Sequence, residues 1–416
     1  MKLICADLEG PLPAIPRRLF GAQWVLVRLH GAPLGYVYPP PDGCTPQQLR
    51  SLIFQDLSWR IAAHLAADSI GRSSEPCASR DLAGPCPRRV APDDAVVTVA
   101  VCTRDRAAML DECLGALASL DYPTDRLELI VIDNAPSDGA TREAVARHPR
   151  IRYVVEPRPG LDWARNRAIR ESRGAIIAFT DDDVSVDPGW VRALAGAFAE
   201  EPRAACITGL VVPDAIDTPA QALFERYGGF GRGFDRAVYS VAPGESAARR
   251  YGGTGRFGTG ANMAFRRSFF EREGLFDPAL DVGTPANGGG DLEMFFRVLK
   301  AGDALVYEPA AVVRHRHRRE YAALRTQLQN NGVGFYAYLV RTAQAYPAER
   351  FAILSLGLWW FWWWNARRAV RSLLRPRSFP LDLIFAELRG SLLGLRRYGA
   401  ARRHAAEVLG RFGAPS

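Results

Sequence analysis

Lysine is almost absent from this chain of 416 residues, although Lys and Arg together number 53. The two lysines, Lys2 and Lys300, stand outside any Gly-Lys-Ser or Gly-Lys-Thr context. A Walker A loop needs such a lysine to bind nucleoside triphosphates, so phosphate-loop NTPase chemistry is excluded. Arginine therefore carries nearly all of the basic charge, and the formal net charge is +8.

Paired cysteines and a secretory signal are also missing. The 7 cysteines form an odd set without any C-x-x-C pair, which fits neither a disulfide framework nor a zinc site. We therefore expect reduced thiols and a cytosolic setting. The first residues, MKLICADLEG, lack the apolar core of a signal peptide. The catalytic part is accordingly expected to stay in the cytoplasm.

Apolar residues make up 48% of the chain, which is ample for a sizeable core. Residues 23–38 contain two β-rich runs that predict a strand pair, and 46–69 follow a helical pattern. Four parts are expected: an N-terminal accessory unit at 1–68, a linker at 69–92 rich in Ser, Gly, Pro and Arg, a catalytic domain at 93–320, and a helical C-terminal region at 321–416.

Beyond residue 95, strand-like runs alternate with helical stretches. The predicted strands are 95–102, 127–133, 151–155, 175–180 and 304–313, and the predicted helices are 107–120, 162–173, 190–199 and 287–300. This alternation indicates an α/β fold with a mostly parallel sheet, in which ligands bind at the carboxyl ends of the strands. Thr103, Asp133 and Asp181 all stand at such ends. Residues 253–258 fit G-x-G-x-x-G but follow no strand, so a glycine-rich substrate loop is expected there instead of a dinucleotide site.

Three consecutive aspartates close one of these strands in the stretch AIIAFTDDDV. Side chains alternate along a strand, so Asp181 and Asp183 share one face, with Cα atoms roughly 6 to 7 Å apart. Mg²⁺ or Mn²⁺ characteristically joins one or two carboxylates to substrate phosphates, and the inferred ligand is a diphosphate. A solvated acidic turn without an ion is the alternative.

A second acidic site lies in NGGGDLEMFFRVLK, where the apolar residues have helical spacing. Asp291 then stands at a helix N-terminus, where exposed N–H groups favour the ionised carboxylate. The three preceding glycines leave room for a substrate. A plain N-cap is the alternative reading of Asp291, and a cap and a base are not exclusive.

Alternating histidines follow the strand at 304–313, in the sequence RHRHRR. In an extended segment His315 and His317 lie on one face, with arginines on the other. One histidine would complete a metal site or contact phosphate; a solvated basic turn is the alternative.

Taken together, residues 95 to about 320 resemble a family 2 glycosyltransferase with the GT-A fold, an inverting, metal-dependent class that uses nucleotide sugars. The resemblance is carried by the order and spacing of several motifs, namely VTVAVCTRDR, LIVIDNAPSD, EPRPGLDWARNRAI, AFTDDDV, FGTGANMAFRR and GGGDLEMFFRVLKAG with the later LVYEPAAVVRHRHR. The motifs cover neither the first 90 residues nor the tail.

The resemblance implies a role for each matching residue. It places Thr103, Arg104 and Asp133 near the nucleotide, and Arg165 and Asn166 near the diphosphate. Asp181 and Asp183 become the DxD metal pair for Mg²⁺ or Mn²⁺, Asp181 also contacting the donor, and His315 falls where a histidine often ends the catalytic domain. Asp291 becomes the general base.

One position departs from the family pattern. The glutamate that usually precedes the base is Gly290 here, which puts in doubt the acceptor contacts that this side chain makes. In the expected reaction, a cation neutralises the leaving nucleoside diphosphate while Asp291 takes a proton from an acceptor hydroxyl, which gives inversion by a single displacement. The acceptor is expected to be a glycan, a lipid-linked molecule or a small molecule. A nucleotidyltransferase and an inactive membrane adaptor are the alternative functions.

The tail contains the apolar run FAILSLGLWWFWWW at 351–364, which is short of the roughly 20 residues of a membrane span. Five arginines follow it, namely Arg367, Arg368, Arg371, Arg375 and Arg377. This pattern predicts peripheral or monotopic attachment to an anionic membrane surface on the cytoplasmic face, with a tilted or re-entrant span and a buried interdomain helix as alternatives. Because the arginines gather largely in this tail, we do not expect nucleic-acid binding.

Overall fold

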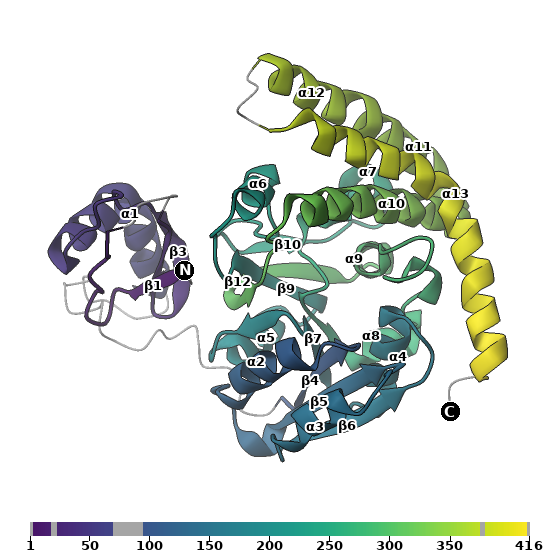
Figure 1. Ribbon diagram of the computed structural model, residues 1–416, viewed down its shortest axis with the longest axis horizontal. Coiled ribbons are helices and arrows are strands. Elements are labelled where there is room, and N and C mark those ends of the chain that lie inside the picture. The colour runs from purple at the N-terminus through teal and green to yellow at the C-terminus, as the bar shows by residue number, and fades with distance from the viewer. Residues whose placement is uncertain (1–2, 18–22, 70–94, 375–378, 414–416) are drawn as a thin grey trace.

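A computed structural model describes residues 3–17, 23–69, 95–374 and 379–413. The linker predicted at 69–92, with Cys77 and Cys86, lies outside the described residues apart from Ser69, and so do Arg375 and Arg377. Within the described part, an N-terminal unit, a large central sheet with its helices and a layer of C-terminal helices follow one another along the chain (Figure 1). The five cysteines described there are free thiols.

The N-terminal unit is a three-stranded sheet covered by one helix. Its strands β1 (Ile4–Asp7), β2 (Val25–Leu29) and β3 (Ala32–Val37) lie in the order β1-β2-β3. The strand pair predicted at 23–38 is confirmed as the β2-β3 hairpin, whose turn has positive φ at His30 (51°) and Gly31 (69°). The predicted helix is α1 (Pro46–Ser69), which buries an apolar stripe against the sheet.

This unit packs against the central sheet. Leu3 and Leu26 share an apolar cluster with residues of the central sheet, and the Leu3 N–H donates to the Asp214 carbonyl at 2.7 Å. Arg28 links the two parts electrostatically, because its Nε lies 2.7 Å from Asp7 Oδ1 and its Nη1 lies 2.5 Å from Asp187 Oδ2.

The central sheet has nine strands, and eight of them lie in the order β10-β12-β9-β11-β7-β4-β5-β6, with β8 beside β12. Six strands run in one direction, while β8, β10 and β11 run against them. The strand bounds are β4 (Val97–Thr103), β5 (Leu127–Asn134), β6 (Ile151–Glu156), β7 (Ile176–Asp181), β8 (Val184–Val186), β9 (Ala204–Pro213), β10 (Ala237–Tyr239), β11 (Asn262–Arg266) and β12 (Ala304–His315). The predicted α/β class with a mostly parallel sheet is confirmed.

Helices cover both faces of this sheet. Along β4, Val97, Val99 and Val101 face one apolar layer while Ala100 and Cys102 face the other, because side chains alternate along a strand. The first layer is formed with α2 (Ala107–Ala118), α3 (Ala140–Ala146) and α5 (Trp190–Glu200), and the second with α4 (Leu161–Glu171), α8 (Arg267–Glu273) and α9 (Gly290–Lys300). All four helices predicted in this region are present.

Strand β11 was not predicted, and it matters for the site. It lies antiparallel between β7 and β9, with Asn262 opposite Thr180 and Met263 opposite Thr208. This register brings the glycine-rich residues just before β11 beside the end of β7. Gly253 follows α7 (Ala247–Tyr251) and precedes a short 3-10 helix, so the rejection of a dinucleotide fingerprint is confirmed.

The remaining helices lie above the central sheet in the view of Figure 1, and α13 continues down one side of it. They are α6 (Pro219–Tyr227), α10 (Tyr321–Ala345), α11 (Arg350–Leu358), a π-helical turn (Trp359–Trp364), α12 (Asn365–Leu374) and α13 (Leu381–Phe412). The backbones of α10 and α13 approach closely at Gly390. A Cβ added there would lie only 1.9 Å from the Gln329 carbonyl oxygen. Among the described residues, no helix combines the length and apolarity that crossing a membrane requires.

Candidate active site

The carboxyl ends of three neighbouring strands bring together the polar residues that close them. In the sheet register, Thr103 of β4 lies opposite Asp133 of β5, and Cys102 lies opposite Asp181 of β7. The expectation that these strand ends meet at one edge is therefore confirmed. Tyr153 of β6 donates a hydrogen bond to Asp133 Oδ2 at 2.7 Å, and burial raises the pKa of Asp133.

The three consecutive aspartates have three different environments. Asp182 is buried; it accepts a hydrogen bond from Thr103 Oγ1 at 2.7 Å and forms an ion pair with Arg106. Asp183 Oδ2 lies 3.0 Å from Arg106 Nη2, and its Oδ1 lies 3.5 Å from His315 Nε2. Arg106 thus forms ion pairs with both Asp182 and Asp183, and no sequence motif pointed to this role.

These partners set the ionisation of the cluster. Burial, with the neighbouring carboxylates, raises the pKa of Asp181 to about 7, although Arg165 opposes this. Burial also raises the pKa of Asp182 to about 6. For Asp183, burial is outweighed by His315, Arg106 and Arg318, so its pKa is lowered. Concentrated negative charge of this kind favours a bound cation.

His315 is held by a chain of polar contacts. Its Nδ1 lies 3.0 Å from His317 Nδ1, and His317 Nε2 lies 2.6 Å from Glu225 Oε1. This arrangement orients His315 Nε2 towards Asp183, as supporting contacts do for metal-ligating histidines. Burial lowers the pKa of His315 to about 4, so the ring is neutral at pH 7. His317 is buried, which excludes the solvated basic turn for this residue.

Of the three predicted metal ligands, only Asp183 and His315 are in direct contact. Among the described residues, no group of three or more His, Cys, Asp or Glu side chains has the arrangement of a metal site. Asp183 and His315 are in contact, while Asp181 faces the adjoining cavity. Carboxylate oxygens with few protein ligands suit Mg²⁺ or Mn²⁺, which keep substrate phosphates and waters as further ligands. The chemistry of these residues therefore fits such a cation.

Asp291 stands in the first turn of α9, one residue inside the helix. The N-cap is Gly289, with φ of 105°, so Asp291 is not the N-cap residue. Its Oδ2 accepts a hydrogen bond from the Gly260 N–H at 2.9 Å, and its Oδ1 accepts one from the Leu292 N–H at 2.9 Å. The glycine-rich loop before β11 thus holds this carboxylate, and it passes so close to Arg165 that a Cβ at Gly260 would lie 2.6 Å from Arg165 Nη2.

One cavity of about 440 Å³ joins the key residues. Of the residues predicted for the site, those that line it are Arg165, Asp181, Asp291 and His315. Its walls also include Phe335 of α10 and Trp360 of the π-helical turn. The centroids of these two rings lie 5.1 Å apart. Thr103, Asp133 and Asp183 lie outside this lining, and Arg104 is exposed.

Asn166 does not face this cavity, contrary to the role near the diphosphate that the resemblance implies. Its Nδ2 donates to the Phe276 carbonyl at 3.0 Å, and its Oδ1 accepts from the Phe276 N–H at 2.9 Å. Both hydrogen-bonding ends of the side chain are therefore used to hold the segment after α8. Asn166 is a buried structural residue.

Two further carboxyls of the site were missed by the sequence analysis. Asp162, in the first turn of α4, lines the cavity, and its Oδ1 accepts from Arg165 Nη1 at 3.1 Å. Asp281 Oδ2 accepts from the Asp162 N–H at 2.9 Å, and burial raises the pKa of Asp281 to about 7. Asp281 is distant in sequence from α4, so no local pattern reveals this contact. Gly160 is required here, because its Cβ would lie 2.1 Å from Asp281 Oδ2.

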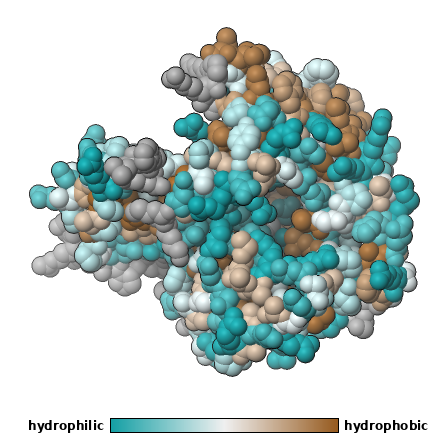
Figure 2. Space-filling model, viewed as in Figure 1, coloured by the Kyte–Doolittle hydropathy of each residue, from teal (hydrophilic) through white to brown (hydrophobic). Residues whose placement is uncertain are grey.

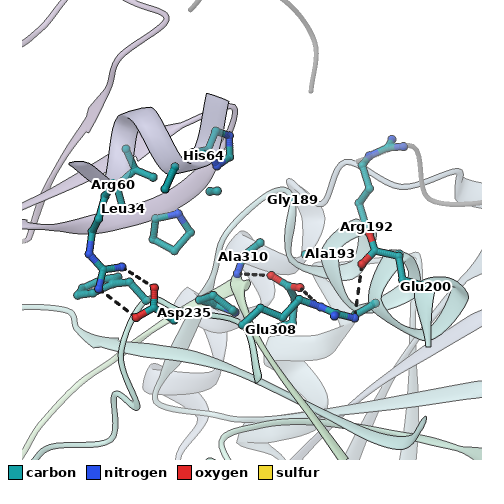
Figure 3. Close-up of a pocket in the computed structure, with 18 of the residues that line it drawn as sticks. Leu34, Arg60, His64, Gly189, Arg192, Ala193, Glu200, Asp235, Glu308 and Ala310 are labelled. Carbon is teal, nitrogen blue, oxygen red and sulfur yellow. Dashed lines mark hydrogen bonds and ion pairs between the residues drawn. The ribbon is translucent and has the colours of Figure 1, made fainter. Parts of the chain in front are cut away.

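A second cavity, of about 560 Å³, lies between the N-terminal unit and α5 (Figure 3). Its charged side chains pair with one another: Arg60 Nη1 lies 2.9 Å from Asp235 Oδ1, and Arg236 Nε lies 3.2 Å from Glu308 Oε2. None of the residues predicted for the site lines it. We therefore assign no part of the reaction to this cavity.

Comparisons with known proteins find similarity to glycosyltransferases in the central part of the chain. The sequence model described as Glycosyl transferase family 2 matches residues 98–274. Glycosyltransferase AglE of Haloferax volcanii is 32% identical over 99 residues, which are 23% of this chain and 33% of that protein. Polypeptide N-acetylgalactosaminyltransferase 13 of Rattus norvegicus is 27% identical over 209 residues, which are 46% of this chain and 36% of that protein. These matches span about a third of the relatives' own length.

Two further proteins are similar over longer stretches. A glucosyl-dolichyl phosphate glucuronosyltransferase of Haloferax volcanii is 22% identical over 240 residues, 53% of this chain and 69% of that protein. The solved structure of mannosyltransferase PcManGT from Pyrobaculum calidifontis, in complex with GDP-Man and Mn²⁺, has a TM-score of 0.42 and 21% identity, covering 77% of this chain and 76% of that one.

Proposed function

We propose that the protein transfers a sugar from a nucleotide diphosphate sugar to an acceptor hydroxyl, and the match of residues 98–274 to the sequence model of glycosyl transferase family 2 supports this. The observation that carries the proposal is the single cavity lined by Arg165, Asp181, Asp291 and His315. It combines the Arg165 guanidinium, which suits a diphosphate, with the Asp181 carboxylate at a strand end and a separate carboxylate, Asp291, suited to general base catalysis.

The donor is proposed to lie along the strand ends. Asp181, Asp183 and His315 would hold Mg²⁺ or Mn²⁺, which when bound supplies charge neutralisation for the departing diphosphate. Arg165 reaches the cavity with a permanent positive charge and binds a phosphate oxygen. Thr103, Arg104 and Asp133 are proposed to contact the nucleotide. The buried pair Thr103 and Asp182 fixes the loop that carries Arg104.

Asp291 is proposed as the general base of an inverting transfer. The Gly260 N–H holds its Oδ2 at 2.9 Å, so the carboxylate is fixed before the acceptor arrives. It takes the proton of the acceptor hydroxyl as the hydroxyl oxygen bonds to the sugar carbon and the bond from that carbon to the diphosphate breaks. A single displacement of this kind inverts the configuration at that carbon.

The acceptor is proposed to be lipid-linked and to be met at the cytoplasmic face of a membrane. Large apolar side chains cover α11, the π-helical turn and α12, with exposed fractions of 75% for Phe351, 67% for Trp362 and 79% for Leu374. Figure 2 shows hydrophobic residues gathered over these helices. Exposed patches of this size mark interaction surfaces. Arg367 and Arg371 are exposed beside them, which favours an anionic surface.

Two details link this apolar surface to the reaction. Trp360 lines the cavity while its neighbours Trp359 and Trp362 are exposed, so the apolar surface reaches the wall of the site. Arg368 does not contribute to the basic surface, because its Nη1 lies 2.7 Å from Glu387 Oε2. An acceptor with a sugar or phosphate head and a lipid tail suits a polar cavity with such an edge.

The test is a matrix of UDP-, GDP- and dTDP-sugars with a panel of octyl glycosides as acceptors, with Mn²⁺, Mg²⁺ or EDTA. We expect release of nucleoside diphosphate with one donor, formation of the glycosylated product and loss of both in EDTA. Inversion is read from the anomeric configuration of the product. Pyrophosphate released from a nucleoside triphosphate would instead identify a nucleotidyltransferase, and inactivity with every donor would favour an adaptor.

A further inference from the structure

The space beside the glycine that precedes Asp291 is already filled. A Cβ added to Gly290 would lie 2.1 Å from Oδ2 and 2.9 Å from Cγ of Asp162. Gly290 is absent from the positive-φ glycines, so its backbone alone does not forbid a side chain. The obstacle is therefore the Asp162 carboxyl, which reaches this point from α4.

The Asp162 carboxyl has one end in use and one end without a partner. Its Oδ1 accepts a hydrogen bond from Arg165 Nη1 at 3.1 Å. Its Oδ2 is buried and has no hydrogen-bond partner among the described residues, and the residue is only 1% exposed. A buried polar atom without a partner is unfavourable unless a ligand completes it. Asp162 lines the same cavity as Asp291, so a substrate is the available partner.

The chemistry of this carboxyl suits a sugar hydroxyl. Burial, with the negative charge of Asp281, raises the pKa of Asp162 well above its usual range. A carboxyl oxygen accepts a hydrogen bond from a hydroxyl in either protonation state, and a protonated carboxyl also donates one, which matches a hydroxyl group. The atom points to the residue next to Asp291, the proposed base, whereas the diphosphate is proposed to lie at the end of β7. The acceptor is therefore the substrate that this oxygen faces.

We infer that Asp162 Oδ2 binds a hydroxyl of the acceptor, and that Asp162 thereby provides from α4 the contact that a glutamate at position 290 would provide from α9. The inference rests on the proposed glycosyl transfer and deepens it. It also accounts for Gly290, since the two carboxyls compete for one place. The two positions should consequently be exchangeable as a pair and not singly.

The experiment uses the full chain, its best nucleotide sugar with Mn²⁺, and the best octyl glycoside from the acceptor panel. Asp162→Ser should raise the KM for the octyl glycoside by about tenfold and leave the donor KM within about twofold, because one substrate hydrogen bond is lost. Asp162→Asn, which keeps a donor and an acceptor in place, should stay closer to the wild type.

Moving the carboxyl from position 162 to position 290 tests whether it contacts the acceptor. A matched variant without any carboxyl shows how much of the effect comes from relieved crowding alone. Gly290→Glu alone should lower kcat/KM for the acceptor by about 100-fold, because its side chain collides with Asp162. The double variant Asp162→Ser with Gly290→Glu should recover to within about tenfold of the wild type, since one carboxyl is restored. The matched double variant Asp162→Ser with Gly290→Ala relieves the same crowding without a carboxyl, and should stay low.

Mn²⁺-dependent binding of the nucleoside diphosphate product, measured by calorimetry, reports whether each variant is folded. If Asp162→Ser does not fold, the KM values of Asp162→Asn decide: an unchanged acceptor KM together with a raised donor KM overturns the inference. Wild-type kinetics for Asp162→Ser, or equal recovery by the two double variants, also overturns it. If the wild type transfers no sugar in the same assay, the proposed function itself is refuted. That outcome differs from a failure of the Asp162 inference alone, in which the wild type is active.

Discussion

At the residue scale, the site gathers more carboxyls than its cations balance. Around the buried Arg165, the carboxyls of Asp162, Asp181 and Asp291 all contribute to a raised pKa of the guanidinium. Asp181 has no closer described cation than Arg165 Nη2, at 3.9 Å. Such a cluster is typical of a functional site and costs stability. A substitution of Asp181 tests this cost, and a substitution of Asp291 tests the proposed chemistry.

Replacing Asp181 by Asn should stabilise the metal-free protein at high pH. The pKa of Asp181 is about 7 in the folded state against 3.8 in the unfolded chain, so its contribution to stability is fully present below pH 3.8 and is lost as the pH rises through 7. We therefore expect Asp181→Asn to raise the melting temperature by about 2 to 4 °C at pH 8 and to change it little at pH 4.

Thermal melting with and without Mn²⁺ measures this effect. In the wild type at pH 8, Mn²⁺ should raise the melting temperature by relieving the repulsion, and in Asp181→Asn it should raise it less. A variant that melts lower than the wild type at pH 8 would contradict the proposed electrostatic cost of Asp181.

Asp291→Asn should separate binding from chemistry. The amide keeps an oxygen for the Gly260 N–H but cannot take a proton, so turnover should fall by about 10² to 10⁴. Donor affinity, measured by Mn²⁺-dependent titration of the nucleotide, should remain near the wild-type value. Asp125→Asn, on an exposed residue outside the site, is the matched control. Unchanged turnover would make Asp291 a helix-terminal residue without a catalytic role.

At the scale of elements, glycines set how closely segments meet. Gly390 of α13 and Gly332 of α10 lie in a close helix crossing, since an added Cβ at Gly332 would lie 2.3 Å from the Glu387 carbonyl oxygen. The same principle holds in the site, where Gly260 lets its loop approach Arg165 and Asp291. At the helix crossing the nearest atoms belong to the backbone and cannot give way as side-chain ends do, so Gly332 and Gly390 are sensitive to a single methyl group.

Gly390→Ala should destabilise the C-terminal helices by about 1 to 3 kcal/mol, because its Cβ would overlap the Gln329 carbonyl oxygen. Gly399→Ala is the matched control in the same helix. An added Cβ at Gly399 meets no atom within 4 Å, so this change should stabilise α13 by about 0.5 to 1 kcal/mol through helix propensity. Chemical denaturation of both variants measures the difference. Equal effects would mean that α10 and α13 do not cross as closely as described.

At the scale of the whole molecule, the N-terminal unit and the C-terminal helices contact the catalytic part in different ways. The N-terminal unit joins the edge around β9 and β12 through an apolar cluster and through Arg28. The C-terminal helices pack over the cavity, and α13 reaches the catalytic part where Tyr398 Oη donates to Asp277 Oδ2 at 2.9 Å. Deleting the whole tail would therefore uncover the interior, and point substitutions test membrane attachment better.

The double substitution Leu358→Glu with Trp362→Glu should weaken binding to anionic vesicles by at least about tenfold, because two exposed apolar side chains of the proposed membrane face become charged. Vesicle flotation at low and high salt measures it. High salt should weaken wild-type binding without abolishing it, since apolar burial supplies most of the attachment. Trp59→Glu, on an exposed tryptophan of α1, is the control. A wild type that does not float with the vesicles refutes the proposed attachment.

Local sequence patterns were sufficient for the order of elements and for the main acidic residues. The alternation of apolar residues reports the face of a strand or helix directly, so the strands ending at Thr103, Asp133 and Asp181 and the helix bearing Asp291 could be predicted. The resemblance to family 2 glycosyltransferases added an expected role for each of these residues. The short strand β11 escaped because its Asn-Met-Ala-Phe-Arg sequence follows glycines and pairs only with distant strands.

Local patterns along the chain are enough to place residues at strand ends, and hence to predict where a diphosphate and a metal ion bind. Which side chains face the cavity depends on the packing of the helices and the sheet. This packing turns Asn166 towards Phe276, joins Arg106 to Asp182 and Asp183, and places Asp162 in the space beside Gly290. These contacts join residues on different elements. Periodicity along the chain carries no information about them, because their geometry depends on how the helices pack on the sheet.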